Sequence, residues 1–335
     1  MLNRFAEVTR GGQLESCHAG ALVIATAAGD ILGVAGANGK EVFPRSSIKL
    51  IQALPLIETG AADRYAMGDG ELALACASHI GSPRHVAIVS RLLERTGLAA
   101  GKLACGPQFP LDIDDQRALL KSGVQPTALH NNCSGKHAAM LLTARHLGEP
   151  VEHYELAQHP VQERIRQTIE EVVGARLDDA IPGIDGCSVP TWRLPLDRLA
   201  IACARLLCGE GLGASRRRAV DRLLSACWAQ SELMAGRGRF DTEILARFPQ
   251  DVFIKAGAEG VYCGAIRSRR IGFAVKIADG AKRAAEAVVG AILAHFLPEA
   301  EDLGQPVIQH NAAGIAVGDV RPGRAVQTVL DGISL

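Results

Sequence analysis

The sequence has few aromatic residues, no net charge and no long uninterrupted apolar run. Aromatic side chains make up 4% of the 335 residues, and 36 Lys plus Arg balance 36 Asp plus Glu. A nucleic-acid-binding protein needs a basic field and often stacking rings, so nucleic acid is not expected as a partner. The most apolar late segment, residues 284–297, contains Glu286 and His295 and is shorter than the roughly 18 residues of a membrane span. We therefore expect no membrane partner.

A secretion signal is also lacking, because charged residues such as Arg4, Glu7 and Arg10 stand where a signal peptide needs an apolar stretch. The nine cysteines are an odd number and are scattered along the chain. Such cysteines are typical of reduced thiols in a core, and a few of them could bind a metal. We therefore expect a soluble, cytoplasmic protein without disulfides.

The apolar runs distinguish the two ends of the chain from its middle. Residues 21–26 and 31–35 predict one strand hairpin, and residues 260–266 and 272–277 predict another. A helix is predicted over 281–297, and the tail at 307–329 is expected to add edge strands. The middle predicts helices bounded by Pro, Gly or Ser, at residues 82–96, 160–173, 195–208 and 215–234.

This arrangement predicts an α/β protein whose antiparallel sheet is assembled from both termini. We assign residues 1–45 and 250–335 to the sheet region and residues 46–249 to a mainly helical region between them. A chain of 335 residues is long enough for one large domain or for two domains. Ligands tend to bind in clefts, so we expect the active site at the junction of the two regions.

The clearest catalytic pattern is Arg45-Ser46-Ser47-Ile48-Lys49. A helix that begins at Ser46, after Pro44, would place Lys49 one turn later on the same face. A serine hydroxyl becomes a nucleophile when a base takes its proton, and a lysine in a dry cleft can be that base. Ser46 and Lys49 thus match the S-x-x-K of acyl-transfer enzymes. An N-cap serine followed by a surface lysine would give the same pattern.

Two further features favour acyl transfer. Lys255-Ala256-Gly257 occurs where penicillin-recognising enzymes have a Lys-(Ser/Thr)-Gly strand beside the nucleophile, although Ala256 replaces the hydroxyl residue. No Ser-Asp-Asn motif is present, and Ser78 in Cys76-Ala77-Ser78-His79 is the candidate second serine. The residue types alone leave a serine acyltransferase and purely structural roles open.

A third polar cluster spans residues 131–137, Asn-Asn-Cys-Ser-Gly-Lys-His. It is not a phosphate-binding loop, because the first glycine is missing and His137 replaces the Ser/Thr. Cys133, Lys136 and His137 would share one helical turn, and a buried cysteine at a helix start fits equally well. A metal shared by Cys133 and Cys187 would require contact in the folded chain.

Five ordered blocks of the sequence resemble the bacterial L-asparaginase II family, the thermolabile or rhizobial type. The blocks are RSSIK at 45–49, CASH at 76–79, NNCSGKH at 131–137, GIDGC at 183–187 and KAGAEG at 255–260. Together they are far more specific than one S-x-x-K. The resemblance implies a serine-β-lactamase/DD-peptidase-like fold, a homodimer, and hydrolysis of L-asparagine to L-aspartate and ammonia.

The resemblance also implies roles for individual residues. Ser46 and Lys49 would be the nucleophile and its base, and Ser78 and Lys255 would assist proton transfer. Lys276 is a weaker candidate for the role of Lys255.

The same resemblance implies one Zn²⁺ per chain, in a supporting role, held by Cys133, Lys136 and Cys187. The implied substrate contacts are Arg45, His137 and Asp185. A zwitterionic amino acid needs a cation for its carboxylate and an acid for its ammonium, and Arg45 and Asp185 are residues of these types.

Two alternatives remain open. Another amide or lactam hydrolase of the same fold, such as a glutaminase, a β-lactamase or a peptidase, would use the same pair of residues. A zinc- or amino-acid-binding regulator would keep the fold without the chemistry, and the presence of both Ser46 and Lys49 speaks against it.

Overall fold

The two compact units of the chain are each assembled from separate segments. The computed structural model describes residues 3–36, 39–177 and 181–334. Unit 1 comprises Met1–Ser47, Arg193–Glu210 and Ile254–Leu335, and unit 2 comprises Ile48–Trp192 and Gly211–Phe253. From the sequence, residues 193–210 were expected in the helical region. They belong to unit 1, because β7 (Leu194–Pro195) pairs with β4 (Glu41–Val42) and the following helix packs on the sheet.

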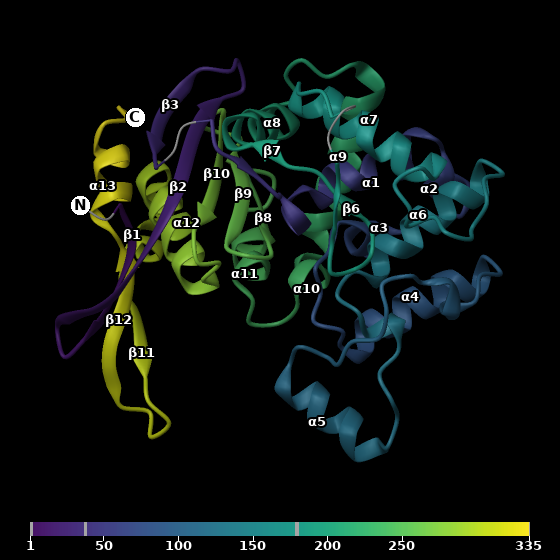
Figure 1. Cartoon of the computed structure of the whole chain (residues 1–335), viewed down its shortest axis with the longest axis horizontal. Helices are drawn as coiled ribbons and strands as arrows, with labels where there is room; N and C mark the ends of the chain where they lie inside the picture. The colour runs from purple at the N-terminus through teal and green to yellow at the C-terminus, as the bar shows by residue number, and fades with distance from the viewer. Residues whose placement is uncertain (1–2, 37–38, 178–180, 335) are drawn as a thin grey trace. The chain divides into compact units, whose positions relative to one another are not determined.

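Unit 1 contains an eight-stranded sheet with the order β11-β12-β1-β2-β10-β9-β8, in which β3 pairs with β2 (Figure 1). The strands are β1 (Arg4–Arg10), β2 (Gln13–Thr26), β3 (Ile31–Ala35), β8 (Val252–Gly257), β9 (Val261–Ile266), β10 (Ile271–Ile277), β11 (Val307–His310) and β12 (Ala316–Pro322). The N-terminal strands β1 and β2 lie between β11-β12 and β10-β9-β8 from the C-terminal part of the chain, and the described registers are antiparallel. The predicted mixed α/β fold with an antiparallel sheet from both termini is confirmed, as are both predicted hairpins.

Part of the predicted C-terminal edge is helical. β11 and β12 form as expected, but α13 (Arg324–Asp331) follows them. Pro322 ends β12, and Gly323 precedes the helix in an extended conformation. Val326 and Leu330 are four residues apart and both are buried, which is the spacing of a helix face rather than of a strand.

Helices α8 (Leu196–Cys208) and α12 (Lys282–Phe296) pack on the sheet of unit 1. α8 contacts β10, β2 and β9, and α12 contacts β12, β1 and β10. β10 is buried along almost its whole length, which explains its nearly continuous apolar sequence. Gly272 in β10 allows α8 to approach closely, because an added Cβ would lie 2.2 Å from the Ala200 carbonyl oxygen and 2.6 Å from the Ala204 nitrogen.

Unit 2 is mainly helical. Its helices are α1 (Lys49–Glu58), α2 (Ala61–Arg64), α3 (Asp69–Cys76), α4 (Pro83–Arg95), α5 (Ile113–Ser122), α6 (Ser134–His146), α7 (Pro160–Val173), α9 (Ala214–Ala229), α10 (Ser231–Ala235) and α11 (Phe240–Arg247), and β5 (Gly183–Ile184) pairs with β6 (Pro190–Thr191). α1 packs against α6, α7 and α9, and α3 packs against α6 and α9. The single helix predicted over 215–234 is broken at Gln230, which lies between α9 and α10 with φ −127° and ψ 43°.

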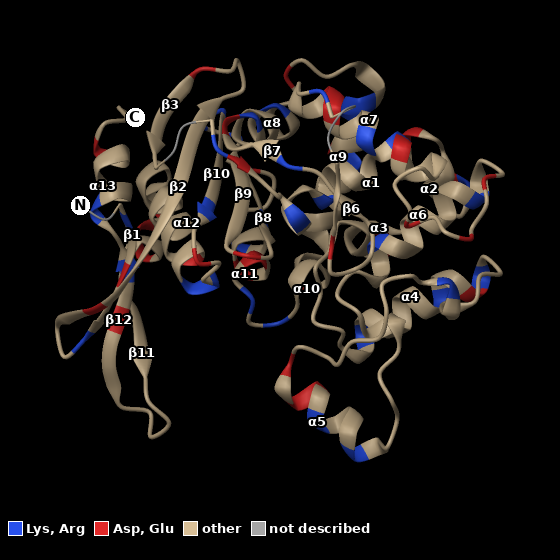
Figure 2. Ribbon diagram, viewed as in Figure 1, with Lys and Arg blue, Asp and Glu red and all other residues tan. Residues whose placement is uncertain are grey.

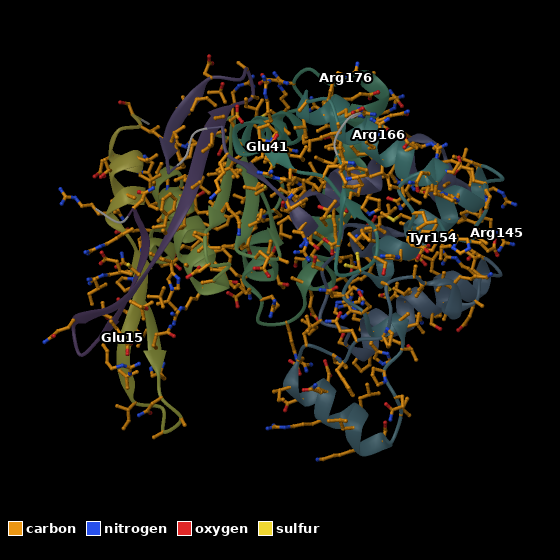
Figure 3. All side chains as sticks on the ribbon, in the orientation of Figure 1. Glu15, Glu41, Arg145, Tyr154, Arg166 and Arg176 are labelled. Atoms are coloured by element: carbon orange, nitrogen blue, oxygen red, sulfur yellow. The ribbon has the colours of Figure 1, made fainter. Side chains whose placement is uncertain are left out.

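Charged residues of both signs are interspersed along the helices (Figure 2). Arg166, labelled in Figure 3, pairs with Glu163 at 3.0 Å and with Glu170 at 2.8 Å. Arg216 joins separate segments of unit 2 by pairing with Glu58 and Glu171, each at 2.7 Å. Within the described residues, no helix is both long enough and apolar enough to cross a membrane.

The contact at Gly272 yields a stability prediction. Gly272→Ala should lower the free energy of unfolding by about 1–3 kcal/mol or more, because the new methyl group must push α8 away from β10. Gly101→Ala is the matched control, since a Cβ there meets nothing within 4 Å. Urea unfolding of both variants measures the difference, and equal stability of the two would contradict the packing described.

Candidate active site

Ser46 lies in a tight turn at the end of the first segment of unit 1, Met1–Ser47. The 3-10 helix η1 (Arg45–Ile48) contains it and continues directly into α1 at Lys49. Arg45 has φ +53°, a left-handed conformation that non-glycine residues rarely adopt. The predicted helix start at Ser46 falls within this 3-10 helix, and the α-helix itself begins three residues later, at Lys49, with Ile48 at its N-cap position. A strained residue directly before a candidate nucleophile is a feature often found at functional sites.

Lys255 belongs to the same unit as Ser46. It is 1% exposed on β8, and its Nζ donates to the Ala256 carbonyl at 3.0 Å. A Cβ at Gly257 would lie 2.6 Å from the Pro44 carbonyl oxygen, so β8 runs against the turn that carries Ser46. The alternative, Lys276, is only half-buried and donates to the carbonyls of Glu259 and Ile277. Burial lowers the pKa of Lys276.

Lys49 is completely buried at the start of α1 in unit 2. Its Nζ donates to Ser78 Oγ at 3.0 Å, to Cys133 Sγ at 3.1 Å and to the Ala77 carbonyl. A buried amine needs such partners because it has left water behind. The structure therefore joins two of the predicted catalytic residues, Lys49 and Ser78, and connects them to the predicted metal ligand Cys133.

The loop that carries Ser78 is held on both sides. Ser78 N donates to the Met234 carbonyl at 2.9 Å, and His79 N donates to the Asn132 carbonyl at 3.2 Å. Gly81 N donates to His79 Nδ1 at 3.1 Å, so the ring proton is on Nε2, which lies 3.0 Å from Ser134 Oγ. Burial, with the neighbouring His85 and Lys49, holds the pKa of His79 well below its usual value. His79 is therefore a neutral support that the sequence analysis gave no role.

The three predicted zinc ligands meet in unit 2. Cys133, Lys136 and Cys187 are each less than 5% exposed, and Lys136 Nζ donates to Cys187 Sγ at 3.0 Å. A hydrogen bond from Cys187 lowers the pKa of Cys133 well below its usual value, and Lys49 and Lys136 act in the same direction. The same hydrogen bond, together with burial, raises the pKa of Cys187. These effects favour ionisation of Cys133 over ionisation of Cys187.

The donor set fits a zinc ion. Thiolates are ligands that zinc prefers, and the Lys136 amine can join them once it loses its proton. Burial alone would lower the pKa of Lys136, but the sulfur atoms of Cys133 and Cys187 raise it overall, so metal binding must release protons. No group of three or more His, Cys, Asp or Glu side chains suitable for a metal occurs in the described part of the chain.

Asp185 and Arg45 lie in different units. Asp185 belongs to the turn before Cys187, where its Oδ1 accepts from Cys187 N at 3.3 Å and its backbone N donates to the Val189 carbonyl at 2.9 Å. Its charge also acts on Lys136. Arg45 precedes Ser46 in unit 1 and is half-buried. The predicted acid therefore lies beside the thiols, and the predicted cation lies beside the nucleophile.

His137 is oriented by a tyrosine that the sequence analysis missed. Tyr154, labelled in Figure 3, has its hydroxyl oxygen 2.6 Å from His137 Nδ1, and the same oxygen accepts from Ala104 N at 2.8 Å. We assign the hydroxyl proton to the bond with Nδ1, and with it the ring proton of His137 to Nε2. Nε2 is buried without a hydrogen-bond partner among the described residues. Burial holds the pKa of His137 well below its usual value, and the Cys187 main chain acts in the opposite direction. No motif in the sequence marks Tyr154.

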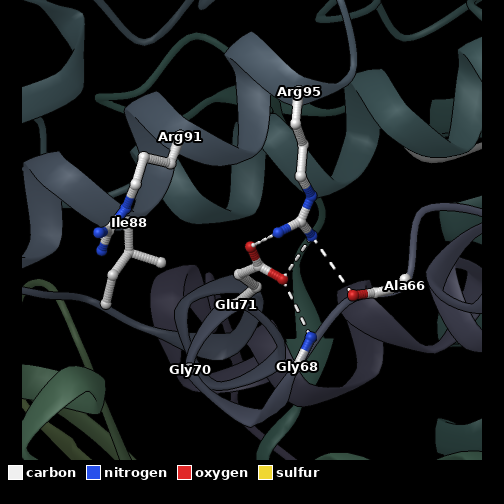
Figure 4. Close-up of a pocket in the computed structure, with 7 residues that line it drawn as sticks. All are labelled: Ala66, Gly68, Gly70, Glu71, Ile88, Arg91 and Arg95. Atoms are coloured by element: carbon white, nitrogen blue, oxygen red, sulfur yellow. Dashed lines mark hydrogen bonds and ion pairs between the residues drawn. The ribbon is translucent and has the colours of Figure 1, made fainter.

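A surface pocket of about 430 Å³ lies elsewhere in unit 2 (Figure 4). It is lined by Ala66, Gly68, Gly70, Glu71, Ile88, Arg91 and Arg95. Arg95 and Glu71 pair at 2.7 Å, and Glu71 also accepts from Gly68 N at 3.0 Å. The pocket contains none of the predicted site residues, and we do not assign the chemistry to it.

Comparison with known proteins identifies the family. The sequence pattern of the L-asparaginase II family matches residues 6–322, nearly the whole chain. A solved structure described as a putative beta-lactamase from Bacteroides dorei DSM 17855 is 12% identical, with a TM-score of 0.39, over 77% of this chain and 84% of that chain. A search of curated proteins found no match. All five blocks singled out in the sequence lie inside the matched range, and the chain belongs to the L-asparaginase II family.

Proposed function

We propose that the protein hydrolyses L-asparagine to L-aspartate and ammonia through an ester formed on Ser46. Family membership supports an asparaginase. The observation that carries the assignment of residues is the buried Lys49, which lies three positions after Ser46 and is hydrogen-bonded to Ser78. A serine and lysine at this spacing are the nucleophile and base of other acyl-transfer enzymes.

The reaction consists of two balanced steps. Lys49, as the free amine, takes the Ser46 hydroxyl proton while Oγ attacks the side-chain carboxamide. The C–N bond then breaks, and ammonia leaves with that proton. In the second step water attacks the β-aspartyl ester, gives a proton back to Ser46 Oγ and releases aspartate. Ser78, which accepts a hydrogen bond from Lys49, is proposed to relay protons, and the buried Lys255 is proposed to assist from β8.

The proposal includes one Zn²⁺ held by Cys133, Lys136 and Cys187. When bound, zinc supplies a positive charge that orients its ligands and can polarise a neighbouring oxygen. The protein itself contributes by holding the turn at residues 185–187, which carries the proposed ligand Cys187. Asp185 accepts from the backbone of Cys187, and His137 offers its Nε2–H to a bound group. We give the metal a supporting role, since Ser46 and Lys49 already provide a nucleophile and a base.

Substrate recognition is proposed to use opposite charges. Arg45 would bind the α-carboxylate and Asp185 the α-ammonium of asparagine, with His137 as a further contact. A glutaminase or another amide or lactam hydrolase would require a different fit at these residues, and a non-catalytic regulator would not need Ser46 and Lys49. The cytoplasmic location and the homodimer expected from the sequence are part of the same proposal.

Loss of the nucleophile tests the function directly. Ser46→Ala should lower the kcat of ammonia release from L-asparagine by about 1,000-fold or more, because catalytic units lose most of their rate with any one member. Ser90→Ala is the control, since Ser90 lies on α4 and bonds only Glu94 among the described residues. Near-normal release by Ser46→Ala would reject the assignment, and no release by the unaltered protein would reject the substrate.

Metal content tests the zinc site. After loading and desalting, elemental analysis should find about one zinc per chain in the unaltered protein, and much less in Cys187→Ala, because a site with one thiolate binds zinc weakly. Cys227→Ala removes a different buried thiol, on α9, and should leave the zinc content unchanged. Equal zinc in all three proteins would show that the metal is not held by Cys187.

A further inference from the structure

We infer that Ser47, the residue after the proposed nucleophile, is a positioning residue whose hydroxyl holds the strained turn that presents Ser46. The inference rests on the proposed role of Ser46. The hydrogen bonds and close approaches that support it join Pro44, Ser47, Gly257 and Cys263, which all belong to unit 1.

The backbone conformation of Arg45 in this turn is unfavourable and must be held by its surroundings. Arg45 carries a side chain at φ +53°, where the backbone of non-glycine residues is strained. Such a residue relaxes to a commoner conformation unless its surroundings hold it in place. Since Arg45 immediately precedes Ser46, relaxation there would turn the Ser46 hydroxyl away from its working direction.

Ser47 supplies the restraint. The Pro44 carbonyl accepts two hydrogen bonds, one from Ser47 N at 3.1 Å and one from Ser47 Oγ at 2.8 Å. The two bonds close the turn around Arg45 and Ser46. Ser47 is 5% exposed, so water does not compete effectively for its hydroxyl. Removing this hydroxyl would take away one of the two hydrogen bonds that the Pro44 carbonyl accepts from Ser47.

Two strands of the sheet also hold Ser47 in place. The Cys263 thiol on β9 donates to Ser47 Oγ at 3.4 Å. On β8, Gly257 approaches so closely that a Cβ would lie 2.6 Å from the Pro44 carbonyl oxygen and 3.3 Å from Ser47 N. The turn therefore contacts two neighbouring strands. The Cys263 thiol of β9 bonds to Ser47, and β8 can approach the turn closely because Gly257 has no side chain.

This arrangement also distinguishes the two adjacent serines. The Ser47 hydroxyl donates to a carbonyl and accepts from a thiol, so both of its hydrogen-bonding functions are used. Ser46 is half-buried and is therefore more exposed than Ser47. Ser47 thus serves the reaction through Ser46 and does not touch the substrate.

The test compares four variants by kcat, KM for asparagine, melting temperature and the rate of Ser46 labelling. A fluorophosphonate is the labelling probe, and mass spectrometry of peptides locates the label. Ser47→Ala removes the hydroxyl, Ser47→Thr keeps it, and Cys263→Ala removes the donor to it. Thr96→Val is the matched control, because the buried Thr96 hydroxyl also bonds backbone carbonyls, those of Leu92 and Leu93, at 2.8 and 2.9 Å.

Ser47→Ala should lower kcat and the labelling rate together, by about 10- to 100-fold, with KM changed less than about twofold, because misplacing a reacting atom by a small distance costs rate. Ser47→Thr should recover most of the loss, and Cys263→Ala should show a smaller loss. Thr96→Val should lose thermal stability without a change in either rate.

Normal kcat and labelling in Ser47→Ala, with only its melting temperature lowered, would overturn the inference. If Ser47→Ala does not fold, unchanged rates in Cys263→Ala would overturn it. Failure of the proposed function looks different, since the label would then fall on a residue other than Ser46, or Ser46→Ala would remain active.

Discussion

The burial of the Lys49 amine is the constraint on which the rest of the site depends. An amine inside a protein requires acceptors, and the acceptors of Lys49 come from the loop at residues 77–78 and from Cys133 at the start of α6. Satisfying this one group therefore fixes three separate segments of unit 2. One of these hydrogen bonds holds Ser78 beside Lys49, the proposed base. The same contact therefore satisfies the buried amine and brings together two proposed catalytic residues.

Electrostatics connects this lysine to the thiols. A hydrogen bond from Cys187 lowers the pKa of Cys133, and Lys49 and Lys136 act in the same direction. The proposed Zn²⁺ would be bound by the sulfur atoms of Cys133 and Cys187 and by the amine of Lys136. Around it, Asp185, His137 and Tyr154 are fixed by hydrogen bonds to the main chain or to one another, as expected of residues that must keep ligands in place.

The sequence was informative where local pattern decides structure. Alternating or continuous apolar runs predicted both hairpins, and the Pro and Gly boundaries predicted α4 and α7 closely. Ordered motifs predicted that Cys133, Lys136 and Cys187 would meet, which no local pattern could show. The unpredicted features depend on contacts distant in sequence or on backbone strain. Arg45 is held in its conformation by bonds around it, Tyr154 reaches His137 from another segment, and residues 193–210 join unit 1 through pairing with β4.

Trapping of the covalent intermediate tests the central claim most directly. The protein would be mixed with L-asparagine, quenched with acid during turnover, digested, and its peptides weighed by mass spectrometry. We expect the peptide that contains Ser46 to carry an added aspartyl group, attached as an ester to that residue and lost on mild alkaline treatment. An aspartyl group on Ser47, Ser78 or any other residue, or turnover without any covalent adduct on the Ser46 peptide, would contradict the account.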